Sequence, residues 1–253
     1  MTMKLYAMTC GWMTMPLGDI LEGEEGMIRI PVPAYLIDHP RGRILFDSGM
    51  HETVATDAKA RLGGMAKYFG VDFQASDHVG AQLGRLDLGV EDVDILVNSH
   101  LHFDHAGGNA AIPNSPVLLQ TREWEAGMDA DLAQANGFQK QDYDTGQDMK
   151  LVEGEHDIFG DGSVTCIPTF GHTPGHQSLL LKMDGGDIFL AGDACDLRRS
   201  LEGLHLPPYA HDKAEMLASI GRVKEFQGRG ARIFFGHDPE FWDTIPLAPT
   251  AIT

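Results

Sequence analysis

Short apolar runs alternate along the chain with glycine turns and with segments of helical periodicity. This alternation of expected strands and helices is typical of an α/β domain. The clearest helix is expected at residues 212–226, where apolar side chains recur at i, i+3 and i+4. Weaker helical patterns cover residues 55–68, 76–83 and 122–136, and a further one follows Asp104. Strands are expected at residues 4–7, 28–37, 44–47, 95–98, 117–120, 164–168, 178–181, 188–191 and 233–235.

No Pro- or Ser-rich linker and no low-complexity tract interrupts this pattern. A chain of 253 residues is long enough to bury one substantial hydrophobic core. We therefore expect a single α/β domain that spans residues 1–253.

The charged residues are unbalanced, with 19 Lys and Arg against 37 Asp and Glu, which gives a formal net charge of -18. So acidic a surface repels phosphate backbones and anionic lipid headgroups. Nucleic-acid and membrane partners are therefore not expected.

The three cysteines, Cys10, Cys166 and Cys195, are far apart and form no C-x-x-C pair. This pattern suits a reducing compartment and indicates neither a disulfide framework nor a thiolate zinc site. The N-terminus shows no secretory signal, and no apolar run approaches the ~20 residues that span a bilayer. We expect a soluble, cytoplasmic protein.

Two segments lack a clear periodicity. Residues 10–27 are rich in glycine and methionine, and the first 27 residues hold six of the 12 methionines. They form either an adaptable apolar loop over a hydrophobic ligand or a methionine-rich strand and loop that fill the core. Residues 51–78 directly follow an expected strand end, and they form either a second lid or a contact between the subunits of a homodimer.

Four potential metal ligands lie within one short run, His100-Leu101-His102-Phe103-Asp104-His105. The run follows the apolar residues 94–97, which are typical of a buried strand. Imidazole and carboxylate ligands together suit zinc and similar divalent ions without a thiolate. Alternation along an extended segment directs His100 and His102 to one side and lets Asp104 and His105 turn toward a second ion. The alternative, a histidine-rich surface loop that binds nothing, does not explain this ordered spacing.

Three further candidate ligands, His172, Asp193 and His237, each follow a glycine at the end of an apolar run. Glycine lets the backbone turn there, and the carboxyl ends of strands are where open α/β sheets bind ligands. Each residue alone is more typical of a turn or a helix cap. Their repeated position indicates that they belong to the same site.

Together these side chains suffice for two ions, provided that one carboxylate bridges them. We assign His100, His102 and His172 to the first ion, and Asp104, His105 and His237 to the second, with Asp193 between the two. Two ions about 3.5–4 Å apart generate hydroxide near neutral pH, and this hydroxide attacks a carbonyl or phosphoryl centre. Asp104 is the best candidate for a general acid or base because it lies beside that hydroxide.

These motifs resemble the metallo-β-lactamase superfamily and, within it, the N-acyl homoserine lactonases. The resemblance covers most of the chain from about residue 28 to 238 and is carried by residues 31–37, 44–50, 100–109, 173–179 and 234–238. It implies a four-layer αβ/βα sandwich of the metallo-β-lactamase type with a dinuclear site at one edge. It also implies that Asp47 orients a metal ligand, that Phe103 lines the pocket, and that residues 10–27 cover an acyl chain.

One position departs from the lactonases, which carry a tyrosine three residues after the bridging aspartate. Here that position is Asp196, and a carboxyl group donates no hydrogen bond unless it is protonated. Three alternatives remain. Asp196 points elsewhere, which is the alternative we favour; its pKa is raised; or another group, such as Tyr209, replaces the phenol.

The resulting hypothesis is a dinuclear hydrolase that opens a small lactone, in the first place an N-acyl homoserine lactone, and thereby acts in quorum quenching. We expect the two divalent ions to be Zn²⁺, although the ligand set also suits manganese, cobalt or iron. One alternative is hydrolysis of another lactone, an ester or a thioester on the same site. A protein that binds metal or ligand without turnover is a further alternative.

Overall fold

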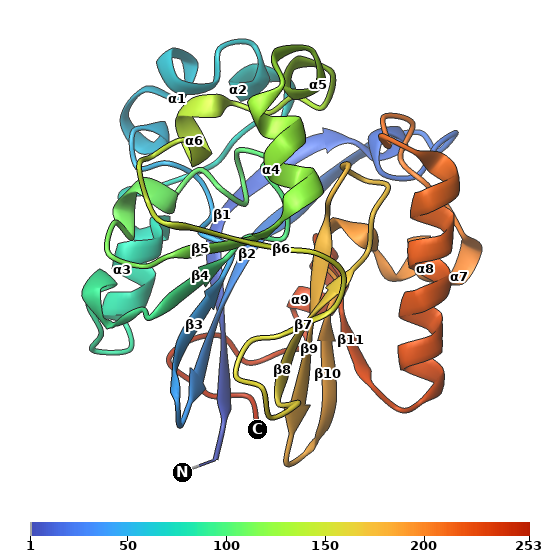
Figure 1. The fold of residues 1–253 in the computed structure, drawn as a ribbon. Helices are drawn as coiled ribbons and strands as arrows, with labels where there is room; N and C mark the ends of the chain where they lie inside the picture. Colours follow the sequence, from blue (N-terminus) through green and yellow to red (C-terminus); the bar gives the residue numbers. More distant parts are fainter. Residues whose placement is uncertain (1) are drawn as a thin grey trace.

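The structure is a computed structural model of the chain and describes residues 2–253. Two β-sheets pack face to face, with helices on the outer side of each (Figure 1). The first sheet contains, in spatial order, β1 (Lys4–Pro16), β2 (Met27–His39), β3 (Gly42–Phe46), β4 (Ile95–Val97), β5 (Val117–Gln120) and β6 (Met149–Val152). The second contains β11 (Arg232–Phe234), β10 (Gly186–Leu190), β9 (Gln177–Met183), β8 (Val164–Pro168) and β7 (His156–Asp157). This arrangement confirms the predicted four-layer αβ/βα sandwich.

The helices divide between the two sheets (Figure 1). On the side of the first sheet lie α1 (Val54–Leu62), α2 (Met65–Tyr68), α3 (Val79–Gly84), α4 (Thr121–Met128), α5 (Ala130–Ala135) and α6 (Lys140–Tyr143). On the side of the second lie α7 (Arg198–Gly203) and α8 (Lys213–Gly228), and the short α9 (Pro239–Trp242) follows β11 and contacts β2. Within residues 2–253, no helix is long and apolar enough to cross a membrane.

The chain connections decide the strand directions and thereby the place of the site. Hairpins join β1 to β2, β2 to β3, β8 to β9 and β9 to β10, so these neighbours are antiparallel. Longer connections precede β4, β5, β6 and β11, which run parallel to the neighbour that precedes them in the chain. As a result, β8, β10 and β11 all end at one edge of the second sheet, as β3 and β4 do in the first.

The period-two alternation of β3 fills both sides of the first sheet. Ile44 and Phe46 belong to the core cluster between the two sheets, together with Leu179 and Ile188 of the second sheet. Leu45, which lies between them in sequence, belongs to the cluster beneath the helices of the first sheet.

All the predicted strands are present, with boundaries that differ by a few residues, except that β1 is much longer than expected. It continues to Pro16, followed by a short 3₁₀ helix, η1 (Leu17–Asp19). The beginning of the segment 10–27 is therefore a methionine-rich strand, and Met13 and Met15 are buried on it.

The weaker helical predictions are corrected by the structure. The predicted helix 55–68 is interrupted at Gly63 and Gly64 and forms α1 and α2. The predicted helix 122–136 is interrupted because the Asp129 side chain accepts hydrogen bonds from two backbone amides and begins α5 as a new helix. The predicted helix 76–83 begins later than expected: the α-helix α3 runs from Val79 to Gly84.

The prediction of a helix after Asp104 is wrong. Turns and a 3₁₀ helix, η4 (Asn109–Ala111), replace it. Gly107 and Gly108 pack so closely that a Cβ atom at either position would lie 2.2 Å from a backbone carbonyl oxygen of Phe103 or Ser48. This close packing keeps the loop against the end of β3.

Candidate metal centre

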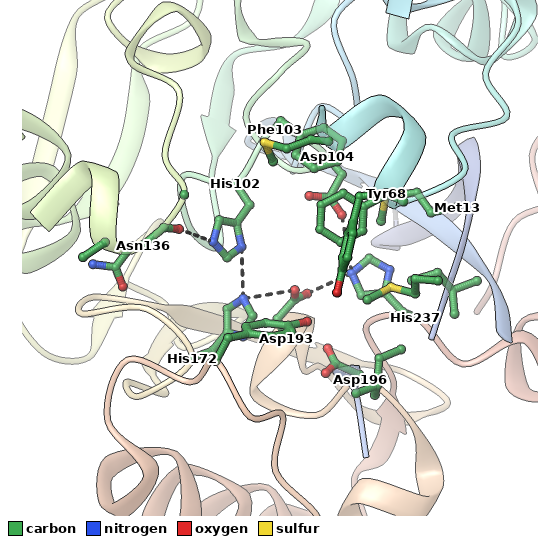
Figure 2. A pocket seen from close by; sticks show the side chains of 18 of the residues that line it. Met13, Tyr68, His102, Phe103, Asp104, Asn136, His172, Asp193, Asp196 and His237 are labelled. Atoms are coloured by element: carbon green, nitrogen blue, oxygen red, sulfur yellow. Dashed lines mark hydrogen bonds and ion pairs between the residues drawn. The ribbon is translucent and has the colours of Figure 1, made fainter. Parts of the chain in front are cut away.

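A cavity of about 320 Å³ opens where strand ends of the two sheets meet (Figure 2). Loops after β4, β8, β10 and β11 carry the candidate ligands to this edge. His102, Asp104, His172, Asp193 and His237 line the cavity, and His100 and His105 are buried beside them.

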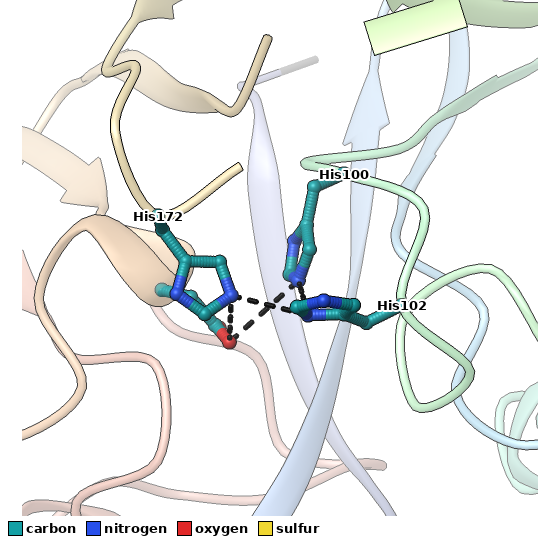
Figure 3. A group of neighbouring side chains, drawn as sticks. His100, His102 and His172 are labelled. Carbon is teal, nitrogen blue, oxygen red and sulfur yellow. Dashed lines mark hydrogen bonds and ion pairs between the residues drawn. The ribbon is translucent and has the colours of Figure 1, made fainter. Parts of the chain in front are cut away.

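The residues assigned to the first ion form one compact group (Figure 3). His102 Nδ1 lies 2.8 Å from His100 Nε2 and 3.1 Å from His172 Nε2. Asp193 Oδ2 completes the group at 3.3 Å from His172 Nε2 and 3.7 Å from His100 Nε2.

The residues assigned to the second ion form a neighbouring group. Asp104 Oδ2 lies 3.5 Å from His105 Nε2 and 3.7 Å from His237 Nε2. Asp193 Oδ1 is 3.2 Å from each of these two nitrogens. Asp193 therefore faces one group with each of its oxygens, as a bridging carboxylate would.

The donor set fits a pair of divalent ions. His105 Nε2 and Asp193 Oδ1 are buried and have no hydrogen-bond partner among the described residues. In the first group, three imidazole nitrogens converge, so their lone pairs face one another. A proton on one nitrogen forms a hydrogen bond with only one neighbour, whereas a cation at the centre is bound by all three nitrogens.

The protonation of the rings differs between the two groups. Burial lowers the pKa of His100 well below its ordinary value, so this ring is neutral, the form that binds a metal. Burial also opposes a charge on His237, but the carboxylates of Asp193 and Asp104 outweigh it and raise the pKa to about 9. The same two carboxylates raise the pKa of His105 well above its ordinary value, against the effect of burial.

A hydrogen bond on the opposite ring nitrogen orients several of these histidines. His105 Nδ1 donates to Asp47 Oδ2 at 2.9 Å. His102 Nε2 donates to the carbonyl oxygen of Asn136 at 2.7 Å, and His237 Nδ1 donates to that of Pro31 at 2.8 Å. Each bond leaves the other nitrogen facing the group.

Two buried side chains that support the site were not predicted as site residues. His176 Nε2 accepts a hydrogen bond from the backbone amide of Asp193 at 3.0 Å. Glu123 accepts hydrogen bonds from Leu101 N at 3.1 Å and Gly175 N at 2.7 Å, and so connects the loop of His100 and His102 to the loop of His172. Glu123 is isolated in the sequence and gives no signal, whereas His176 lies in a motif that already indicated a family.

Asp196 lines the cavity, so the favoured expectation that it points elsewhere is wrong. Its carboxyl group is buried beside Asp193 and His237. Burial, and then the charge of Asp193, raise the pKa of Asp196 well above its ordinary value. Tyr209 lines the same cavity and lies edge-on to His172, with the ring centroids 6.2 Å apart.

The rest of the cavity wall is mostly apolar. Residues 10–27 and 51–78 both contribute to it, and the hydroxyl group of Tyr68 on α2 donates a hydrogen bond to Asp19 on η1 at 2.6 Å. Both segments thus line the cavity, and this hydrogen bond joins them. The larger apolar lining side chains are Met13, Met15, Ile20, Ile30, Met65, Phe69 and Phe103.

Comparison with known sequences identifies related proteins. The family model for the metallo-beta-lactamase superfamily matches residues 28–237. N-acyl homoserine lactonase AttM of Azorhizobium caulinodans is 30% identical to the chain over an alignment of 255 positions that covers 97% of each protein. N-acyl homoserine lactonase of Bacillus cereus is 33% identical over 217 residues, 85% of this chain and 84% of that protein.

Solved structures show the same architecture. An N-acyl homoserine lactone hydrolase, with the product N-hexanoyl-L-homoserine bound at its catalytic metal center, matches with a TM-score of 0.87 and 30% identity over 100% of both chains. A mutant of Bacillus thuringiensis AiiA, with N-decanoyl-L-homoserine bound at its active site, has the same TM-score, identity and coverage. The chain belongs to the metallo-β-lactamase superfamily.

Proposed function

We propose that the protein is a dinuclear metal-dependent lactonase that opens the ring of N-acyl homoserine lactones. The observation that carries this proposal is the pair of ligand groups joined by Asp193 at the wall of a largely apolar cavity. The relatives support the substrate class, since they are named N-acyl homoserine lactonases, and two similar solved structures hold an N-acyl homoserine at the catalytic metal center or the active site.

The seven predicted ligands would hold the two ions as their grouping suggests, with Asp193 as the bridge. Imidazole and carboxylate ligands suit Zn²⁺, which is the ion we propose. Bound ions of this kind polarise a carbonyl group and lower the pKa of water, so that hydroxide is available near neutral pH.

Asp104 is the side chain to which we assign proton transfer. Burial opposes its charge, but His105 and His237 outweigh this effect and hold the pKa of Asp104 below its ordinary value. The group is therefore ionised at neutral pH, as a proton acceptor must be. Its Oδ2 faces the two histidines, so Oδ1 is the oxygen that would take a proton from water and return it to the leaving alkoxide.

The apolar cavity wall would bind the acyl chain and exclude water from it. Phe103 lies next to Asp104 in sequence and lines this wall, beside the ring of Phe69. Tyr209 is half-exposed on the loop between α7 and α8 and lines the cavity on the side of His172. We assign to its phenol the hydrogen bond to substrate that the tyrosine missing at position 196 would otherwise donate.

A pH-stat assay tests this function, because ring opening releases one acid equivalent per turnover. With metal-replete protein, acid should be released faster from N-acyl homoserine lactones than from plain γ- and δ-lactones or from a thioester. Asp104→Asn should reduce the rate at least about a hundredfold if Asp104 transfers the proton. A protein that holds about two ions per chain and acidifies none of the acyl homoserine lactones would refute the substrate assignment.

A different small lactone or ester is a second candidate substrate. The observation that favours it is Asp196, which gives the cavity wall a carboxyl group where the lactonases carry a tyrosine. Faster turnover of a plain lactone than of every acyl homoserine lactone in the same panel would select this candidate.

A further inference from the structure

We propose that the Asp196 carboxylate is an additional ligand of the second ion, the ion assigned to His105 and His237. The inference rests on the proposed dinuclear site and goes beyond it, because it adds an eighth ligand to the seven that the motifs provide. It also gives Asp196 a function of its own at the position where the lactonases carry a tyrosine.

The distances between the candidate ligand atoms favour this role. A carboxylate oxygen of Asp196 forms a group with ligand atoms of Asp193 and His237, all within 4.8 Å of one another. Two oxygen or nitrogen ligands about 2.2 Å from one ion are at most about 4.4 Å apart. Small side-chain movements therefore suffice to bring all three onto one ion. Figure 2 shows the Asp196 side chain at the cavity beside Asp193 and His237.

The Asp196 carboxyl group also contains an unsatisfied polar atom. Asp196 is only 3% exposed, and no described residue forms a hydrogen bond with its Oδ1. His105 Nε2 and Asp193 Oδ1, which face the candidate ion positions, are in the same condition. Burial of a carboxylate without a partner is costly, and coordination of a cation removes this cost.

The backbone, in turn, fixes Asp196 next to a ligand. The backbone amide of His237 donates to the carbonyl oxygen of Asp196 at 2.9 Å, and the amide of Gly236 donates to that of Cys195 at 3.0 Å. These two bonds align the segment after η5 (Gly192–Ala194) with the end of β11. The two side chains therefore reach the cavity from neighbouring, hydrogen-bonded segments.

The additional carboxylate changes the chemistry expected of the second ion. The first group offers three imidazole nitrogens, whereas the second would offer oxygens from Asp104, Asp193 and Asp196. Oxygen-rich sets suit Mn²⁺ better than nitrogen-rich sets do. We therefore expect the two positions to differ in metal preference, with Mn²⁺ retained better at the second than at the first.

The test compares the wild-type protein with Asp196→Ala, Asp196→Asn and the control Tyr209→Phe, which alters the same cavity wall without removing a carboxylate. Competition with a chelator measures the affinities of both ions, for Zn²⁺ and Mn²⁺ separately. Asp196→Ala should weaken the second ion at least about tenfold, more for Mn²⁺ than for Zn²⁺, and leave the first unchanged. Tyr209→Phe should bind both ions as the wild type does.

Thermal unfolding separates a ligand from a merely structural residue. Without metal, Asp196→Asn exchanges one buried polar group without a partner for another of the same shape and removes a carboxyl group that Asp193 repels, so the Tm should stay the same or rise. With metal bound, the same variant should have a lower Tm than the wild type. A structural role predicts a lower Tm in both states, and that result would overturn the inference.

The metal titration distinguishes a failure of this inference from a failure of the proposed function. Two ions bound with wild-type affinities in Asp196→Ala would overturn the ligand role of Asp196 and leave the dinuclear site intact. Fewer than two ions in the wild type would overturn both proposals.

Discussion

Glu123 is a single buried carboxylate on which two ligand loops depend. Its Oε1 accepts a hydrogen bond from Leu101 N, and its Oε2 accepts from Gly175 N and from the hydroxyl group of Thr173. Burial raises its pKa to about 7, against the effect of these donors. Leu101 separates two ligands of the first group, and Thr173 follows the third. Glu123 therefore joins a loop of the first sheet to a loop of the second.

Glu123→Gln should reduce both the stability and the affinity for the first ion. The new amide NH₂ must replace one of the accepting oxygens and would then face a donor. An unsatisfied buried donor costs about 1–3 kcal/mol in the free energy of unfolding, which a denaturant titration measures. Glu125→Gln, an exposed change on the same helix, should stay within about 0.5 kcal/mol of the wild type. Equal stability of the two variants would contradict the structural role of Glu123.

Uptake of the second ion should strengthen as the pH rises. The pKa of His237 is about 9, so at pH 7 its ring carries a proton that a cation must displace. The affinity should increase by about tenfold per pH unit for each displaced proton, and should level off above the pKa. Metal titrations of the metal-free protein between pH 6 and 10 measure this slope. A constant affinity over that range would show that His237 loses no proton on binding.

The side chains at the site differ in how well the sequence predicts them. His100 to His105 form an ordered run after an apolar strand, and the other candidate ligands follow glycines at strand ends. The partner atoms of His102 and His237, by contrast, are backbone carbonyl oxygens, and any residue type supplies one. Such contacts depend on the fold, and the local sequence gives no signal for them.

At the scale of elements, buried strands were predicted better than short helices and edge strands. The central strands are continuous apolar runs because both of their faces are covered. β6 and β7 were missed because none of their residues is buried, which weakens the apolar pattern, whereas two of the three residues of the edge strand β11 are buried. Length was misjudged for β1, where glycine and methionine hid a continuous strand.

Packing between a ligand loop and a helix depends on Gly171. This residue has φ +120°, and a Cβ atom there would lie 2.0 Å from the backbone nitrogen of Met216 in the first turns of α8. The backbone amide of Asp212 donates to the carbonyl oxygen of Gly171, and that of His211 donates to His172. The start of α8 therefore holds the His172 loop in place.

Gly171→Ala should separate this loop from α8. Positive φ costs an alanine about 1–2 kcal/mol, and the clash adds about 1–3 kcal/mol. Gly154→Ala is the matched control, because Gly154 also has positive φ, but a Cβ atom there would meet no atom within 4 Å. Denaturant unfolding should show the larger loss for Gly171→Ala, together with weaker binding of the first ion. Equal losses would mean that the loop moves freely away from α8.

At the scale of the whole molecule, the site joins the two sheets. The run from His100 to His105 follows β4 of the first sheet, whereas His172, Asp193 and His237 follow strands of the second. Each ligand group contains residues from both halves of the sandwich. An ion bound in either group would therefore stabilise the packing of one sheet against the other, in addition to any catalytic role.

Removal of the metal should consequently lower the global stability. A ligand at a free concentration a thousandfold above its Kd stabilises the folded state by about 4 kcal/mol. For a chain of this size, each kcal/mol corresponds to about 2–4 °C, so a chelator should lower the Tm by roughly 8–16 °C. Zn²⁺ should restore it, whereas Mg²⁺ at the same concentration should not, because Mg²⁺ prefers oxygen ligands and retains its water. If the acidic surface alone bound the cations, Zn²⁺ and Mg²⁺ would restore the Tm equally. In that case the histidines would not contribute to the packing of the two sheets.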